Sequence, residues 1–315
     1  MSELRIITRA EVSELLTPGL LRPALEAALV AQSNGQANVP PRIAAVGPQG
    51  LLAAMPGHLD GVGMAAKLVS VFAGQDPSHQ GVIVVVDPHT GVLRSIMDAE
   101  VITERRTAMT AAIAADALAR SDANVLTIVG GGAQGHAHVA AFGGIRPWSE
   151  IRIVSRTRNK ATVLAAEARF TFRSEVSINE FDHFEQAVVG ADVVALCTHA
   201  EGPVVEAGWV DAGTHVSSVG SLAELSTELL DHHLTVDQLG AVADAPPAGA
   251  IELQGLDPST VIELGSLLAD RSLGRVDNDQ VTVYKSTGHA VQDIAAAHVV
   301  LDAANEADVG LVIDF

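Results

Sequence analysis

Three glycines between an apolar stretch and a helical stretch have the spacing that most clearly predicts chemistry. Gly130, Gly132 and Gly135 stand in a G-x-G-x-x-G pattern. Between a strand and a helix, the first glycine permits a tight turn, the second lets the backbone approach a pyrophosphate, and the third lets helix and strand pack closely. The free N–H groups at the start of the helix, at Ala133 and Gln134, would hold the anion. The pattern therefore favours a dinucleotide-binding site over a structural turn.

The end of the next predicted strand indicates which nicotinamide cofactor binds. Ser155, Arg156 and Thr157 directly follow the apolar run Ile151 to Val154. An NAD site normally places Asp or Glu there to accept from the ribose hydroxyls, whereas a hydroxyl and a guanidinium suit the 2′-phosphate of NADP. We expect a preference for NADP(H), with NAD(H) as the alternative. The competing interpretation is that these side chains are merely solvated at a strand end.

An alternation of strands and helices after residue 124 predicts the scaffold that positions these residues. It favours an α/β fold, a doubly wound parallel sheet of the Rossmann type. The expected strands are 125–129, 151–154, 193–197, 215–219, 241–243 and 281–284, and a final helix is expected over 289–307. The N-terminal part lacks this rhythm and should form a separate α+β substrate domain, with the reaction in the cleft between the domains.

Three elements are expected in the N-terminal part. Ala10 to Gln32 is typical of an amphipathic helix, and Gly81 to Val86 of a buried strand. A long helix should follow, with Thr103 as its N-cap and Arg106 on its first turn. The alanine-rich run Ala108 to Ala119 favours this helix and offers small side chains for close packing.

Composition sets the outer limits. The chain has 315 residues and a formal net charge of −19, which opposes non-specific binding to nucleic acid or an anionic membrane. It contains no run of about 20 apolar residues, and its first residues are too charged for a signal peptide. We therefore expect a cytoplasmic protein. The single cysteine, Cys197, excludes an intrachain disulfide and should be a buried, inert thiol; no metal site is expected.

Five ordered motifs resemble the ornithine cyclodeaminase/mu-crystallin family over nearly the whole chain. They are MPGHLDGVGMAAKLVS, TGVLRSIMDAEVITERRTAMTAA, LTIVGGGAQGHAHVAAF, IRIVSRT and KSTGHAVQDIAAA. The resemblance implies a homodimer built through the N-terminal domain. It also implies that the last helix returns to that domain, so that residues 1–119 plus 290–315 form the substrate and dimerisation domain, and residues 120–289 form the dinucleotide-binding domain.

The resemblance also implies which residues form the site. Lys67, Arg106 and Arg42 match the lysine and two arginines that surround the carboxylate of an amino or imino acid, although surface ion pairs would explain such residues equally simply. Lys67 and Asp293 are the candidate catalytic residues, because a buried Lys67 would have a lowered pKa and Asp293 would orient it, unless that acid faces solvent. Further cofactor contacts are expected from Thr198, Lys285, Ser286 and Gly288, where a capping hydroxyl or a turn is the alternative.

Two departures from the cyclodeaminase pattern decide between activities. Leu222 and Ala53 stand where cyclodeaminases place an aspartate and a glutamate for the amines of ornithine, although Glu224 would substitute in a different register. Without those acids, a buried ammonium would be unsatisfied. We therefore expect an NAD(P)H-dependent imine or ketimine reductase, or an amino-acid dehydrogenase, acting on a small imino or amino acid such as pyrroline-2-carboxylate. The alternatives are ornithine cyclodeaminase and a non-catalytic binding protein of the mu-crystallin type.

Overall fold

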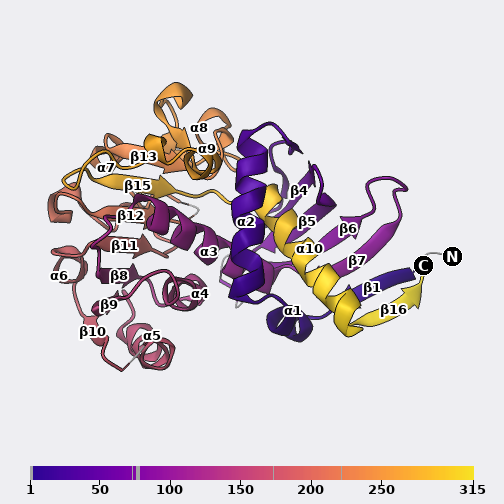
Figure 1. Cartoon of the computed structure of the whole chain (residues 1–315), viewed down its shortest axis with the longest axis horizontal. Helices are drawn as coiled ribbons and strands as arrows, with labels where there is room; N and C mark the ends of the chain where they lie inside the picture. The colour runs from indigo at the N-terminus through magenta and orange to yellow at the C-terminus, as the bar shows by residue number, and fades with distance from the viewer. Residues whose placement is uncertain (1–2, 73, 76–78, 173, 221) are drawn as a thin grey trace. The chain divides into compact units, whose positions relative to one another are not determined.

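The computed structural model describes residues 3–72, 74–75, 79–172, 174–220 and 222–315. The chain forms two compact units (Figure 1). Unit 1 combines Met1–Arg106 with His289–Phe315, and unit 2 is Thr107–Gly288. The domain division expected from the sequence, with boundaries at 119/120 and 289/290, stays a prediction.

Unit 1 is an α+β unit built on one mostly antiparallel sheet. Its strands run in the order β16-β1-β7-β6-β5-β4-β2, and β3 also pairs with β4; among the strands described here, β1 and β7 are the one parallel pair. The strands are β1 (Glu3–Ile7), β2 (Ala37–Asn38), β3 (Ile43–Val46), β4 (Leu51–Leu59), β5 (Gly63–Val71), β6 (His79–Val86), β7 (Leu93–Asp98) and β16 (Leu311–Asp314). The helices are α1 (Arg9–Leu15), α2 (Pro18–Ser33), the first turns of α3 (Glu100–Leu118), and α10 (Ala290–Ala307).

Helices cover one face of the unit 1 sheet. α10 packs against β4, β5 and β6 and lies beside α2, as Figure 1 shows. Residues alternate along β5 between this buried face and the opposite face, because successive side chains of a strand point to opposite sides. Ala65 and Lys67 therefore point toward the helices, while Met64 and Leu68 are exposed on the other face.

Three expectations for unit 1 need correction. The single helix predicted over 10–32 is two helices, since Pro18 lacks an N–H and begins a new helix after Thr17. Thr103 is not an N-cap: α3 begins at Glu100, and the N–H of Val101 donates to Asp98 Oδ1. Arg106 therefore lies beyond the first turn, and the positive end of the helix dipole does not act on it as expected.

Unit 2 is a doubly wound sheet of eight parallel strands, which confirms the predicted fold class. The strand order is β10-β9-β8-β11-β12-β15-β13-β14. The strands are β8 (Val125–Val129), β9 (Glu150–Val154), β10 (Ser177–Phe181), β11 (Val193–Leu196), β12 (His215–Ser218), β13 (His233–Val236), β14 (Ile262–Glu263) and β15 (Thr282–Lys285). The helices are the remainder of α3, α4 (Ala133–Phe142), α5 (Arg158–Thr171), α6 (Phe184–Val188), α7 (Thr227–Leu230), α8 (Gly240–Ala243) and α9 (Leu264–Ala269).

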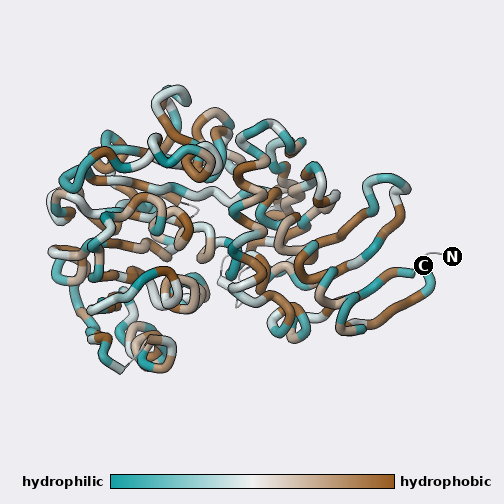
Figure 2. The backbone as a smooth tube through the Cα atoms, viewed as in Figure 1, coloured by the Kyte–Doolittle hydropathy of each residue, from teal (hydrophilic) through white to brown (hydrophobic). Residues whose placement is uncertain are grey.

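The strand order reverses between β8 and β11, which makes their carboxyl ends the place where ligands of such sheets bind. Hydrophobic residues follow the strands of this sheet, and hydrophilic residues gather in the outer loops (Figure 2). The strand predicted at 241–243 is wrong, because this short apolar run forms α8. β10 and β13 were not predicted, since their polar residues hide the apolar pattern. No helix in the described ranges is long and apolar enough to cross a bilayer.

Candidate active site

A buried charged cluster in unit 1 joins three elements that are far apart in the sequence. Lys67 on β5 places Nζ 2.8 Å from Asp293 Oδ2, and Arg106 on α3 donates from Nε to Asp293 Oδ1 at 3.1 Å. Asp293 lies on the first turn of α10. All three residues are at most 5% exposed, so that their charges must satisfy one another or a ligand. The lysine, one arginine and the acid expected in the site are thus brought together.

Two neighbours that the sequence did not predict complete the cluster. Gln292 Oε1 accepts from Arg106 Nη1 at 2.9 Å, and Lys67 Nζ donates to Thr103 Oγ1 at 3.5 Å. A spacing signal for Thr103 exists, because it precedes Arg106 by three residues and so shares its face of α3. Both contacts hold the two cations in a fixed orientation around Asp293.

The strands beside Lys67 are apolar at its position. Met55 on β4 and Ile83 on β6 are its direct cross-strand partners, and both are buried. Burial lowers the pKa of Lys67 to about 8, although Asp293 acts to raise it. For Asp293, burial raises the pKa, but Lys67 and Arg106 outweigh this and leave it below its ordinary value.

Arg42 is a fourth charged group that acts on the same cluster. It is half-buried just before β3, and its charge lowers the pKa of both Lys67 and Asp293. The four interacting groups therefore carry three positive charges and one negative charge when Lys67 is protonated. Such an excess of buried positive charge is suited to an anionic ligand, and a carboxylate matches the planar guanidinium of arginine.

The adjacent arginine has a different role. Arg105 Nη1 donates to the carbonyl oxygens of Ser13 and Leu16, both at 2.7 Å, at the end of α1. These are carbonyls that a helix leaves without partners within itself. Arg105 thus stabilises the end of α1, and only Arg106 reaches the charged cluster.

The glycine turn of unit 2 has the geometry that a dinucleotide needs. Gly130 has φ +116°, and a Cβ there would lie 2.7 Å from the carbonyl oxygen of Cys197. A Cβ on Gly135 would lie 2.2 Å from Gly130 O, so that helix and strand approach too closely for any side chain. A Cβ on Gly132 would meet nothing described within 4 Å, and no side chain caps the start of α4. The residues present therefore fit a pyrophosphate on the N–H groups of Ala133 and Gln134.

The end of β9 presents the residues predicted to select the cofactor. Arg156 is exposed, and Ser155 Oγ accepts from the N–H of Thr157 at 3.4 Å. Arg158 forms an ion pair with Asp182. Arg156, by contrast, has no ion-pair or hydrogen-bond partner among the residues that the structure describes. Its guanidinium is therefore available to a phosphate.

Buried polar networks hold the loops that follow β11, β12 and β15. Glu224 Oε1 accepts from the N–H and hydroxyl of Thr198 at 2.7 and 2.5 Å, and its Oε2 accepts from Ser218 Oγ and the Gly220 N–H at 2.9 and 2.8 Å. Four donors thus occupy this carboxylate, which is fully buried. Glu224 fastens two loops together, and this position does not offer the free acid that a cyclodeaminase requires.

Lys285 lies in the same region but binds protein groups. Its Nζ lies 2.7 Å from Glu252 Oε1 and donates to Gly220 O at 2.7 Å. The next residues are organised by a second buried acid, Asp237, whose Oδ2 accepts from Ser286 Oγ at 2.9 Å and from the Gly288 N–H at 2.7 Å. The cofactor contacts expected from Thr198, Lys285, Ser286 and Gly288 stay predictions, and what the structure adds is the set of acids that position them.

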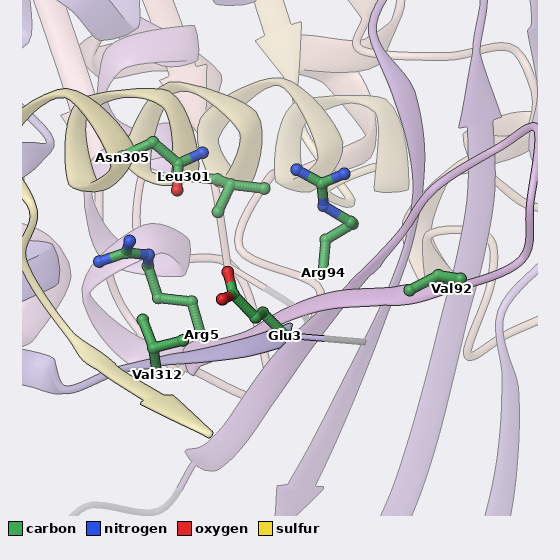
Figure 3. Close-up of a pocket in the computed structure, with 7 residues that line it drawn as sticks. All are labelled: Glu3, Arg5, Val92, Arg94, Leu301, Asn305 and Val312. Atoms are coloured by element: carbon green, nitrogen blue, oxygen red, sulfur yellow. The ribbon is translucent and has the colours of Figure 1, made fainter. Parts of the chain in front are cut away.

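The structure also bears on three other kinds of site: a reactive cysteine, a metal site and a second cavity. Cys197 is buried, as expected, and burial raises the pKa of its thiol well above the ordinary value; that the thiol is inert stays a prediction. Within the described residues, no group of three His, Cys, Asp or Glu side chains could hold a metal ion. A cavity of about 330 Å³ lies elsewhere in unit 1, beneath Leu301 and Asn305 of α10 (Figure 3), and its lining includes none of the predicted site residues.

Comparisons with known proteins agree with this geometry. The model of the ornithine cyclodeaminase/mu-crystallin family matches residues 3–308. Ketimine reductase mu-crystallin of Mus musculus is 34% identical over 303 residues, which cover 91% of this chain and 93% of that protein. The structure of Delta(1)-pyrroline-2-carboxylate reductase from Thermococcus litoralis, in complex with NADH and L-proline, has a TM-score of 0.89 at 26% identity and covers 98% of this chain and 99% of that one. An archaeal alanine dehydrogenase dimer with bound NAD has a TM-score of 0.90 at 28% identity, with both chains fully covered.

Proposed function

Because the chain belongs to the ornithine cyclodeaminase/mu-crystallin family, we propose that it is a nicotinamide-dependent reductase that converts a small imino acid into the corresponding amino acid. The observation that carries the proposal is the buried cluster of Lys67, Arg106 and Asp293, with its excess of positive charge. The related proteins support it, since two of them are named for imine reduction and one of those was solved with NADH and L-proline.

The charged groups around Lys67 favour a substrate with a single charged end. Asp293 is the one acid among the described groups that act on its pKa. Ala53 is buried on the same face of β4 as Met55, so this strand offers no carboxylate for a distal ammonium. A buried ammonium without an acid costs several kcal/mol, on the order of 3–5 when a pair is broken. Small cyclic imines such as pyrroline-2-carboxylate and piperideine-2-carboxylate therefore suit the site better than ornithine.

The residues of unit 1 have separate roles in the proposed reaction. Arg106 and Arg42 bind and orient the carboxylate, since guanidinium groups match its planar geometry. Lys67, whose pKa is about 8, holds a proton at Nζ near neutral pH and delivers it to the imine nitrogen. Asp293 holds Nζ in place through its 2.8 Å contact. When bound to unit 2, the nicotinamide supplies the hydride that reduces the carbon of the C=N bond.

The cofactor preference is part of the proposal. Arg156, which has no partner among the residues with a described placement, supports NADP(H) over NAD(H) together with the hydroxyls of Ser155 and Thr157. The related structures carry NADH or NAD, so the same fold also accommodates the unphosphorylated cofactor. The cytoplasmic location expected from the sequence stays a prediction.

A homodimer through unit 1 is also proposed. The face of its sheet opposite α10 exposes apolar side chains that alternate along neighbouring strands, with Leu52, Met64, Leu68 and Val82 between 37% and 52% exposed. Contiguous apolar surface of this kind marks protein interfaces. A second copy of the chain would cover it, as the archaeal alanine dehydrogenase dimer supports. Leu68→Glu should lower the mass measured by light scattering to that of a monomer, whereas an unchanged mass would contradict this interface.

The reaction is tested with purified protein and a panel of substrates. NADPH and NADH oxidation is followed with pyrroline-2-carboxylate and piperideine-2-carboxylate, and ammonia release is followed with L-ornithine. We expect oxidation with the cyclic imines and no ammonia from ornithine. Lys67→Met should lower kcat/KM at least about 100-fold, because it removes the proton donor while keeping an apolar side chain of similar length. Release of ammonia and proline from ornithine, without oxidation of either cofactor by the imines, would overturn the proposal.

A further inference from the structure

The chain contains three lysines, which differ in their exposure to solvent. Lys67 and Lys285 are buried in the networks of units 1 and 2, at 3% and 1% exposure. The third, Lys160, is exposed. It lies on the first turn of α5, just after the end of β9, and is the one lysine that none of the networks described above uses.

Lys160 packs directly against the glycine turn. A Cβ added to Gly131, between the first two glycines of the motif, would lie 2.8 Å from the Cβ of Lys160 and 2.9 Å from its carbonyl carbon and oxygen. Gly131 is therefore required for the close approach of the first turn of α5. This contact places the backbone and Cβ of Lys160 beside the turn, only four residues beyond Arg156.

The charges at this end of α5 are unbalanced. The side chains of Arg156 and Lys160 have no ion-pair or hydrogen-bond partner in the part of the chain that the structure describes, while Arg158 between them pairs with Asp182. α5, which the structure describes throughout, has no acid in its first turn. The positive end of the helix dipole disfavours cations near the start of a helix. The two cations nevertheless lie at the start of α5, in a chain of net charge −19. Two available cations at such a position favour an anionic ligand.

We propose that Lys160 acts with Arg156 to bind the 2′-phosphate of NADP(H) and is a determinant of cofactor preference. The proposal rests on the dinucleotide site of the proposed function. In that site the adenine ribose lies between the glycine turn and the end of the second strand, which are the two segments that Lys160 and Arg156 flank. Arg156 offers a planar fork to the phosphate, and Lys160 offers a mobile point charge from the side of the glycine turn.

The test uses nucleotides that need no reaction. Calorimetry compares adenosine 2′,5′-bisphosphate with adenosine 5′-monophosphate, which differ by the 2′-phosphate alone, and then compares NADPH with NADH. We expect Lys160→Ala to lower the preference for the 2′-phosphate about tenfold, the usual effect of losing one charge-assisted hydrogen bond. Lys160→Arg should restore most of it. Arg169→Ala is the matched control, because it removes one cation from the far end of α5, where Arg169 pairs with Glu180.

The outcomes separate this inference from the proposed function. If Lys160→Ala and Arg169→Ala lost the preference for the 2′-phosphate equally, the change in net charge alone would explain the loss. That result would overturn a specific role for Lys160. A wild-type protein that binds both members of each pair equally would overturn the inference while leaving imine reduction with NADH intact. A protein that binds neither NADPH nor NADH would overturn the proposed function and the inference together.

Discussion

Asp293→Asn should move the pH dependence of the enzyme toward acid. In the wild type, burial lowers the pKa of Lys67 to about 8, and Asp293 is the acid that limits this shift. Without its charge, Lys67 faces Arg106 and Arg42 alone, so its pKa must fall further. Because Lys67 donates a proton in the proposed reaction, kcat/KM should decline as pH rises through that pKa, and the decline should begin at lower pH in the variant.

The size of the shift follows from the geometry. Charges 2.8 Å apart attract by at most about 6 kcal/mol at an effective dielectric constant of about 20. Breaking a buried pair usually costs about 3–5 kcal/mol, and one pKa unit corresponds to about 1.4 kcal/mol. A shift of at least about one pH unit is therefore expected.

Profiles of kcat/KM between pH 6 and 10 measure this shift, with Asp308→Asn as the control. Asp308 also pairs with an arginine of unit 1, Arg5, but is exposed, so its amide variant should keep the wild-type profile. A decline at the same pH in Asp293→Asn and wild type, or a shift toward alkali, would refute the assignment of the proton to Lys67.

Three further predictions concern structure and binding. Arg106→Ala should lower kcat/KM at least about 100-fold, whereas Arg105→Ala should lower the free energy of unfolding by about 1–2 kcal/mol without changing kcat/KM. Gly132→Val should fold with an unchanged Tm but lose dinucleotide affinity by calorimetry, whereas Gly130→Ala should lower Tm, because its φ of +116° strains any side chain. Glu224→Gln should lower the free energy of unfolding in urea by about 1–3 kcal/mol, since an amide group then faces two of four buried donors; an unchanged value would show that these bonds are weak.

Local sequence predicted the parts of the fold that depend on local rules. The β8-turn-α4 segment was placed correctly because glycines and an apolar strand adjoin in the sequence, and their conformations are fixed within a few residues. α8 was missed because four apolar residues carry no period that separates a strand from a helix. β16 was missed because its pairing with β1 joins residues about 300 positions apart, which no local pattern reveals.

The site was predictable only where residue type and resemblance coincided. Lys67, Arg106 and Asp293 were named from the resemblance, and a contact between Asp293 and Lys67 was expected from it. The contact of Arg106 with the same carboxylate and the role of Arg105 at the end of α1 depend on tertiary structure and were not predicted. The sequence did not predict that the buried carboxylates of Glu224 and Asp237 hold loops in place by accepting hydrogen bonds, because an isolated acid in a loop sequence is typically solvated. These two acids can be buried because hydrogen-bond donors at the ends of three strands, β11, β12 and β15, satisfy them.

Because one of the three lysines is exposed and two are buried, an amine-reactive reagent can label a single lysine side chain of this protein. With Lys67 and Lys285 buried, an amine-reactive dye at mildly alkaline pH reaches only Lys160 among the lysine side chains. The α-amino group, which has a lower pKa, can be blocked first near pH 7. One fluorophore can then be attached beside the glycine turn without mutation. Its emission would report cofactor arrival directly, and protection of this amine by NADP⁺ would be visible as a loss of labelling in intact-mass spectra.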